Sequence, residues 1–297
     1  MMLRYLILIL LVLSSVSLQA QDDEKEEKRR LDSLFIEEVE NPKEKGLKDK
    51  VLHAEPLFID LIRDLGARKG EHEWNVGVGL TDNVNYDKYT ALVEYEFAPI
   101  DRLGLEIELP FSFYLPLNGS SEETPRSKLN SLKLAAQYTF LVSEKAKTSL
   151  AIGYLHDFEF VSFSDYGKRR FYKGNLYNPF FIAAKRWGNN FHTLVYTGPV
   201  IEQVFEDRKW ISEFQINSNI HYMISGTRNF IGIEINKEIQ AGQMSTVLRP
   251  QMRVGVTHNF LIGIVTGIPI SRENERFSTF LRVIYEPERK GKNKAKH

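Results

Sequence analysis

Four glutamates alternate with apolar residues in the stretch EYEFAPIDRLGLEIELPF, which covers residues 94–111. They are Glu94, Glu96, Glu106 and Glu108. Two carboxyl groups held about 5 Å apart can hydrolyse a glycosidic bond, one as nucleophile and one as acid. The same alternation is typical of a β-strand with one polar and one apolar face. Because nothing else in the sequence builds a sugar site beside these acids, we favour the strand face.

Other signatures of catalysis or metal binding are weak. The sequence contains no G-x-S-x-G and no H-E-x-x-H, the patterns of serine hydrolases and zinc proteases. His53-Ala-Glu55 and Glu71-His72-Glu73 offer too few ligands for a metal site, and a solvated linker explains both. We therefore expect no enzyme, no metal site and no cofactor.

Composition narrows the possible partners and compartments. The chain has 297 residues, no cysteine and a net charge of zero. Disulfides and thiolate metal sites are therefore excluded, and no basic surplus favours nucleic acid as a partner. Residues 1–20 combine one arginine, an apolar run and small residues, which predicts a cleaved signal peptide rather than a membrane anchor. No later stretch has the 18 or so apolar residues of a membrane helix.

The chain before residue 71 divides into two parts. Residues 21–52 are mostly charged and predict a flexible arm in the periplasm. Residues 53–70 predict a short helix over 56–65, since leucines recur at helical spacing between Pro56 and Gly66. This helix has two interpretations: it lies on the inner leaflet, or it enters the mouth of a barrel as a partial, weakly held plug.

From Trp74 onward the hydrophobic period is two. Twelve antiparallel strands are expected, starting near residues 74, 88, 103, 131, 148, 176, 191, 210, 230, 246, 260 and 277. Each has about ten residues or slightly more, enough for a tilted strand to cross a bilayer. The fold class is therefore all-β, a transmembrane up-and-down barrel over residues 71–287, followed by a basic tail at 288–297. A secreted β-sandwich is the alternative.

Connections and aromatic residues favour the barrel. Even-numbered connections are tight, whereas odd-numbered ones tend to be long, notably around residues 116–127 and 161–173. Outer-membrane barrels have short periplasmic turns and long external loops, so both termini are expected in the periplasm. Aromatic residues also gather beside the short turns, as an interfacial girdle would: Trp74, Tyr95, Phe97, Tyr138, Phe140, Trp187, Phe191, Tyr222, Phe230, Phe260 and Tyr285.

The pattern from about residue 53 resembles that of small Gram-negative outer-membrane barrels of the porin or transporter type. The stretch HAEPLFIDLIRDLGARKGEHEWNVGVGLTDN in particular resembles a group of uncharacterised barrels from the Bacteroidota. The resemblance implies an outer-membrane location, contact with membrane lipid and insertion by the barrel assembly machinery. One departure concerns the C-terminus: such barrels often end on an aromatic residue, whereas EPERKGKNKAKH follows Tyr285 here.

If the apolar strand faces meet lipid, the opposite faces line a lumen. The lumen then receives Glu94, Glu96, Glu106, Glu108, Lys133, Asp157, Glu159, Glu213, Glu234, Glu238, Arg249, Arg253 and Arg282. The acids and the arginines are expected on opposite walls, with a transverse field that orients a dipolar solute. Alternatively the charges pair and plug the lumen.

Five prolines fall inside expected strands: Pro110, Pro179, Pro199, Pro250 and Pro269. Each removes a ladder hydrogen bond, so bulges or frayed pairing are expected there.

The sequence favours passage or binding of a small polar or amphipathic solute as the function. A non-conducting barrel that acts through its external loops is the alternative. An outer-membrane hydrolase is less favoured, because the His-x-Ser pair of the outer-membrane phospholipase does not occur.

Overall fold

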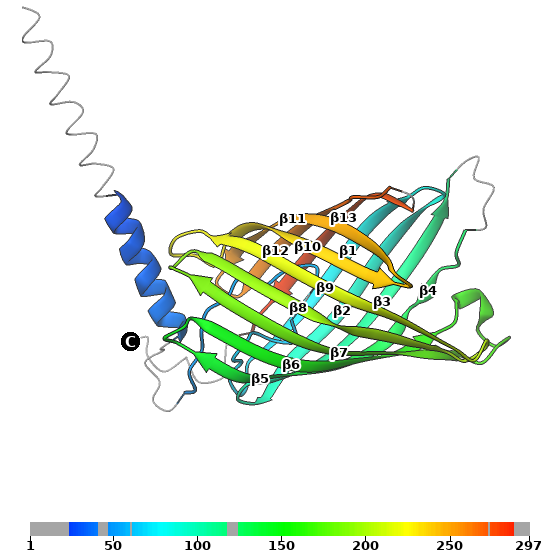
Figure 1. Ribbon diagram of the computed structural model, residues 1–297, viewed down its shortest axis with the longest axis horizontal. Coiled ribbons are helices and arrows are strands. Elements are labelled where there is room, and N and C mark those ends of the chain that lie inside the picture. Colours follow the sequence, from blue (N-terminus) through cyan, green and yellow to red (C-terminus); the bar gives the residue numbers. More distant parts are fainter. Residues whose placement is uncertain (1–23, 41–46, 60, 118–123, 273, 288–297) are drawn as a thin grey trace, which may run out of the picture.

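Twelve long strands close into one antiparallel barrel (Figure 1). The computed structural model describes residues 24–40, 47–59, 61–117, 124–272 and 274–287. The long strands are β1 (His72–Asn83), β2 (Tyr86–Ile100), β3 (Leu103–Pro116), β5 (Ser131–Ser143), β6 (Thr148–Phe160), β7 (Tyr172–Trp187), β8 (Phe191–Val204), β9 (Lys209–Met223), β10 (Phe230–Gln240), β11 (Gln243–Thr257), β12 (Phe260–Pro269) and β13 (Glu275–Tyr285). Because β1 pairs with both β2 and β13, the ring has no free edge.

The expected barrel is confirmed almost strand by strand. Every expected strand begins within four residues of an observed one, because alternation of apolar and polar residues marks each half-exposed strand. A short additional strand, β4 (Lys128–Leu129), pairs with β3 and was not expected. Among the described residues, no helix is both long and apolar enough to cross a membrane.

The two ends of the barrel differ in their connections. At one end, here called the tight-turn end, the connections are 101–102, 144–147, 188–190, 224–229 and 258–259. At the other, the long-loop end, only 117–130 and 161–171 are long, and the second holds the 3-10 helix η1 (Phe163–Asp165). The expectation that odd-numbered connections are longer is wrong for 84–85 and 241–242, which are two-residue turns.

Side chains alternate between the inside and the outside of the wall. Along β1, Trp74, Val76 and Val78 are 46–48% exposed, whereas the alternating residues Glu73 and Asn75 are buried. The outer surface is therefore the apolar one, as a membrane requires. The aromatic girdle is confirmed by exposed side chains such as those of Tyr138, Trp187 and Tyr222. Phe230 is an exception, because its ring is fully buried inside the barrel.

Prolines interrupt the ladder without changing its register. Pro179 and Pro199 lie where β7–β8 pairing stops between Tyr177↔Ile201 and Phe181↔Thr197. Pro250 lies in a similar gap of β11–β12 pairing, between Leu248↔Ile268 and Gln251↔Val265. The residue offset is the same on both sides of each gap. These prolines therefore remove hydrogen bonds, as expected, but they do not create bulges.

The N-terminal helix is present at a different place from the one expected. It covers residues 24–40, within the segment expected to be a flexible arm, and lies outside the barrel at the tight-turn end (Figure 1). Residues 56–59 and 61–65, expected to be helical, are irregular and run inside the barrel. The expected signal peptide (1–20) and basic tail (288–297) lie outside the described residues.

Candidate functional site

Residues 47–70, here called the plug, occupy the lumen at the tight-turn end. Asp60 is the one plug residue outside the described part of the chain. The plug packs into two apolar clusters formed by different sectors of the wall. Leu61, Ile62 and Leu65 join one with β6–β8 side chains, and Ala54 and Leu57 join another with side chains of β9, β10 and β12. The leucines at helical spacing therefore do not share one face, which explains why a helix was the wrong expectation.

Backbone groups of the plug bond mainly to side chains of the wall, although Ala67 N donates to Asp64 O within the plug (2.9 Å). Leu57 N donates to Gln251 Oε1 (2.7 Å), and Ile59 N donates to Glu234 Oε1 (3.1 Å). On another sector, Gly66 N donates to Thr139 Oγ1 (3.0 Å). Buried amides must find acceptors, and here polar side chains that face inward replace the carbonyls of a helical turn.

Arg63 is the most heavily constrained plug residue. Its φ of 66° lies in the left-handed region, which costs a side-chain-bearing residue about 1–3 kcal/mol. Three contacts hold it there. Its N–H donates to Glu96 Oε2 (2.6 Å), its carbonyl accepts from Gln137 Nε2 (3.0 Å), and its guanidinium pairs with Glu73.

Two wall glycines let the plug approach the sheet closely. A Cβ atom on Gly104 of β3 would lie 1.9 Å from the carbonyl oxygen of Ile62. A Cβ atom on Gly263 of β12 would lie 2.5–3.2 Å from the Leu57 side chain. Any larger residue at Gly104 must therefore displace the plug backbone, whereas at Gly263 it must displace one leucine.

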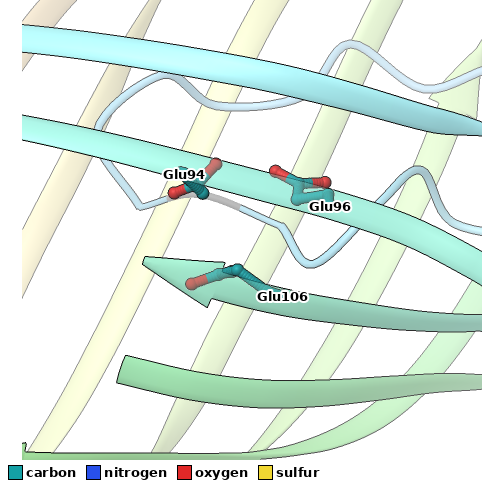
Figure 2. A group of neighbouring side chains, drawn as sticks. All are labelled: Glu94, Glu96 and Glu106. Atoms are coloured by element: carbon teal, nitrogen blue, oxygen red, sulfur yellow. The ribbon is translucent and has the colours of Figure 1, made fainter. Parts of the chain in front are cut away.

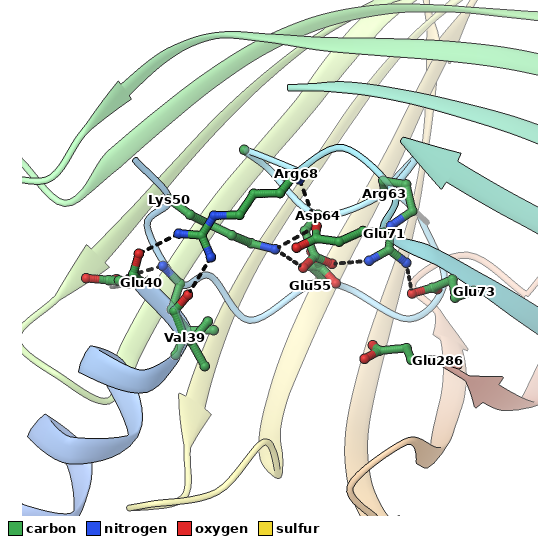
Figure 3. A network of polar contacts seen from close by, with 12 residues as sticks. Val39, Glu40, Lys50, Glu55, Arg63, Asp64, Arg68, Glu71, Glu73 and Glu286 are labelled. Atoms are coloured by element: carbon green, nitrogen blue, oxygen red, sulfur yellow. Dashed lines mark hydrogen bonds and ion pairs between the residues drawn. The ribbon is translucent and has the colours of Figure 1, made fainter. Parts of the chain in front are cut away.

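A charged network joins the plug to the outer helix (Figure 3). Lys50 pairs with Asp64 and Glu71, and Arg68 donates to backbone carbonyls in the last helical turn. Burial alone would lower the pKa of Lys50, but the charges of Asp64 and Glu71 raise it above its usual value. Glu55 lies beside Asp64, and burial together with that carboxylate raises the pKa of Glu55.

The outer helix is anchored to the rim by its acids. Glu40 Oε1 accepts from Leu52 N (2.7 Å) and from Arg186 Nη2 (2.6 Å). Asp32 accepts from Gly226 N (3.0 Å) in the β9–β10 turn. A cavity of about 870 Å³ remains between the helix, the plug and this turn. The helix therefore covers the mouth without filling it.

His53 points from the plug into the wall. Its Nε2 lies 3.0 Å from Ser149 Oγ, while the next backbone amide donates to His192 Nδ1 (3.0 Å). Burial, reinforced by the nearby His192 and Arg186, lowers the pKa of His53 to about 3. The imidazole is therefore neutral at ordinary pH.

The four glutamates of the β2–β3 hairpin lie together, as expected. Glu94 pairs with Glu108 and Glu96 with Glu106 in the register, and all four are at most 5% exposed. Lys133 of β5 bridges Glu106 (3.1 Å) and Glu108 (2.6 Å). Glu94, Glu96 and Glu106 bring carboxylate oxygens within 4.8 Å of one another (Figure 2).

The basic residues are not collected on an opposite wall. Arg282 lies 3.5 Å from Glu94 and belongs to the acidic sector, because β13 is separated from β2 only by β1. Arg249 stacks 3.4 Å above the Phe58 ring of the plug, and Arg253 lies 3.9 Å from Glu55. The expectation of an acidic wall facing a basic wall is therefore wrong. It did not include the plug, whose side chains contact the arginines of β11.

The remaining expected lumen charges lie toward the long-loop end. Asp157, Glu159 and Glu213 are half-buried, and Glu238 is exposed. Asp157 accepts from Ser131 Oγ (2.9 Å), and Lys173 lies 3.6 Å from Glu159. Asp157 pairs with Lys133 in the β5–β6 register and so lies at the edge of the buried cluster, whereas the other three acids are separate from it.

A cavity of about 340 Å³ lies on the long-loop side of the plug. Phe58, Ile59 and Ile62 of the plug form part of its lining, and Glu106, Glu108, Lys133 and Arg282 contribute the charges. Asn178, Tyr196 and Gln215 add a polar patch in which Asn178 Oδ1 accepts from Tyr196 Oη (2.8 Å) and Gln215 Nε2 (2.9 Å).

The sequence reasoning missed this neutral patch because it selected only charged inward residues. Strand alternation would have found it, since Tyr196 and Asn217 of neighbouring strands are paired inward-facing positions. The role of Gly104 could not be predicted in this way, because nothing in the sequence shows that the plug backbone passes close to it.

The family of the chain follows from its sequence. The profile of the HAEPLYID-like family matches residues 49–286, which is most of the chain. The chain belongs to this family. The match starts in the plug and ends one residue after β13, so it covers plug and barrel and begins after the outer helix. The resemblance carried by the HAEPL stretch is confirmed. No curated protein matches the sequence.

Solved structures share the fold. The COG4313 outer membrane channel from Pseudomonas putida F1 superimposes with a TM-score of 0.59 at 13% identity, covering 75% of this chain and 98% of that one. The NanC porin gives a TM-score of 0.52 at 8% identity, with 72% and 100% covered. At such low identity the likeness concerns the fold, which is that of outer-membrane barrels.

Proposed function

We propose that this protein is an outer-membrane channel or transporter that is closed by its own N-terminal segment. A small polar or amphipathic solute binds in the 340 Å³ cavity, and displacement of the plug admits it to the periplasm. The tight-turn end and both termini then face the periplasm. Catalysis is not part of this proposal.

The observation that carries the proposal is the combination of a plug and a cavity in one lumen. The plug is bound mainly through side chains of the wall, and no strand of the barrel includes it. Its removal therefore leaves the sheet hydrogen bonds of the ring intact. A barrel built only as a rigid support has no need of a separable segment with a cavity above it.

The cavity lining supports a solute with both polar and apolar groups. Phe58, Phe180 and Phe280 provide aromatic rings, while the amides of Asn178 and Gln215 provide donors and acceptors. Lys133 neutralises much of the charge of Glu106 and Glu108. A pocket of this size and composition is within the range of small-molecule sites.

The decisive experiment locks the plug to the wall. The chain has no cysteine, and positions 57 and 263 are close enough for a disulfide. We expect wild-type protein in planar bilayers to conduct in intermittent openings. Oxidised Leu57→Cys/Gly263→Cys protein should be silent, and reductant should restore its openings. Gly263→Cys alone, treated identically, is the matched control.

The alternative function has its own structural support. The two long loops contact each other through Arg126–Asp165 (3.1 Å) and the bond from Phe163 N to Ser127 O (3.0 Å). Contacts between the described parts of the two loops suit recognition of an external partner. Wild-type protein that remains silent in bilayers and takes up no solute in liposomes would contradict the channel and favour this alternative.

A further inference from the structure

Hydrogen-bond acceptors outnumber donors in the acidic sector, which is the part of the lumen lined by the inward glutamates of β1, β2 and β3. The Asn75 side chain, which is fully buried, places Nδ2 near Glu94 (2.6 Å), Glu73 (2.9 Å) and Glu96 (3.0 Å). One NH₂ group has two hydrogens, so three carboxylate oxygens compete for two protons. At least one of these contacts therefore lacks a hydrogen bond.

Two acceptor atoms at the same place have no hydrogen-bond donor among the described residues. They are Oδ1 of Asn75 and Oε2 of Glu94, and both residues are 0% exposed. The oxygen and nitrogen of an asparagine amide exchange places when the group rotates by half a turn. In that orientation Oδ1 of Asn75 points at the carboxylates, which is favourable only if a metal cation or a proton lies between them.

The acidic sector also contains more negative than positive side chains, so a bound cation would balance its charge. Five buried carboxylates face inward from β1, β2 and β3: Glu73, Glu94, Glu96, Glu106 and Glu108. Three cationic side chains contact them: Arg63, Lys133 and Arg282. With all five ionised, two negative charges remain, and one divalent cation balances them. Uncompensated buried charge of this kind is very costly.

We propose that Glu94, Glu96, Glu106 and Asn75 form a binding site for one divalent metal ion, with calcium as the preferred ion. All the donor atoms are oxygens, which is the chemistry of Ca²⁺ and Mg²⁺ sites. The carboxylate oxygens lie within 4.8 Å of one another, about twice a calcium–oxygen bond of roughly 2.4 Å. Mg²⁺ retains several waters, and a site at most 3% exposed has little space for them.

The proposed ion would lie where plug and cavity meet. Glu96 accepts the backbone N–H of Arg63 (2.6 Å), and Glu106 lines the solute cavity. Figure 2 shows the plug backbone passing beside the three carboxylates. A bound ion would fix the side chains that the plug uses as anchors. This site does not depend on whether the barrel conducts.

Direct binding of calcium tests the proposal. The full chain in detergent is stripped with EDTA and dialysed against radioactive Ca²⁺ at pH 7. We expect one ion per chain in wild type, weaker binding of Mg²⁺, and none in Glu94→Gln/Glu96→Gln. Glu159→Gln/Glu213→Gln, which alters acids of the long-loop half, should bind as wild type does.

A second variant keeps the test valid if the glutamine variant does not fold. Asn75→Asp adds a carboxylate, so it should bind calcium more tightly, by about tenfold, since affinity follows ligand charge. Equal binding by wild type and Glu94→Gln/Glu96→Gln would overturn the site. Absence of calcium binding in wild type would also overturn the site. If, in addition, acidification from pH 7 to 5 stabilised wild type but not the glutamine variant, protons and not a metal ion would neutralise the cluster.

Discussion

The two halves of the lumen use the same wall in different ways. In the tight-turn half, inward side chains bond the backbone of the plug, and 13 of its 23 described residues are buried. In the long-loop half, inward charges and amides bond one another across strands and surround a cavity. Single strands contribute to both halves. Along β2, Glu96 binds the plug, whereas Thr90 and Leu92 line the cavity.

This difference shows how one alternating pattern serves two tasks. Strand alternation fixes only which residues face inward. The partners of these residues depend on whether the plug or the cavity occupies the lumen beside them. Glu234 and Gln251, which would line a pore in an empty barrel, are instead acceptors for plug amides. Variants that affect one half and spare the other therefore test the comparison directly.

The largest effect is expected for Arg63→Ala. It leaves Glu73 buried without its cationic partner, and loss of one member of a buried pair costs about 3–5 kcal/mol. The plug should detach more often, which should raise the open probability in bilayers several-fold. Arg208→Ala is the control, since Arg208 has a similar φ of 52° but is exposed at the long-loop end. Equal effects of the two variants would show that backbone strain, and not the plug contacts, matters.

Gly104→Ala should have the next largest effect. The added methyl group lies 1.9 Å from the Ile62 carbonyl oxygen, and overpacking of this kind costs about 1–3 kcal/mol. Denaturant unfolding and the rate of proteolysis within residues 47–70 would measure the loss. Gly255→Ala is matched, because its nearest neighbour is 3.4 Å away. Unchanged protease resistance in Gly104→Ala would mean that the plug does not contact β3 in solution.

A pH change should loosen the plug through His53. Its folded pKa of about 3 lies below the unfolded value near 6.5, so the unfolded segment binds the proton first as the pH falls. Stability is therefore lost between these values, by roughly 1.4 kcal/mol per pH unit for this group. The groups around it are Ser149, His192 and Arg186.

The measurement compares wild type with His53→Gln between pH 7 and 5.5. Open probability of wild type should rise on acidification more steeply than that of the variant. Parallel curves for the two proteins would assign the pH response to other groups, such as Glu55.

The smallest effect is expected in the other half. Glu106→Gln with Glu108→Gln removes both carboxylates that form ion pairs with Lys133 at the cavity, so permeability should shift from cations toward anions. The reversal potential in a salt gradient measures this shift. Glu238→Gln, at an exposed position, is the control. An unchanged reversal potential in a conducting barrel would mean that ions do not pass this cavity.

The wall was predictable from sequence, whereas the contents of the lumen were not. Alternation located the strands, and the pairing of Glu94 with Glu108 follows from the hairpin at residues 101–102. No comparable sequence pattern predicts the conformation of the plug. Its leucines at helical spacing suggested a helix, but acceptors such as Gln251, 194 positions away in the chain, take its backbone amides. Local sequence does not reveal a hydrogen-bond partner that lies so far away along the chain.

The position of the plug directly before β1 constrains how the molecule folds. The plug contacts β10 and β11 at separations of 175 and 194 residues, while β1 closes the ring against β13. Contacts this distant in sequence form slowly, because a long loop must close first. The plug, which is made before every strand of the barrel, thus finds its place only when the last strands have been made. Docking of the plug and ring closure are therefore late, coupled events of barrel maturation.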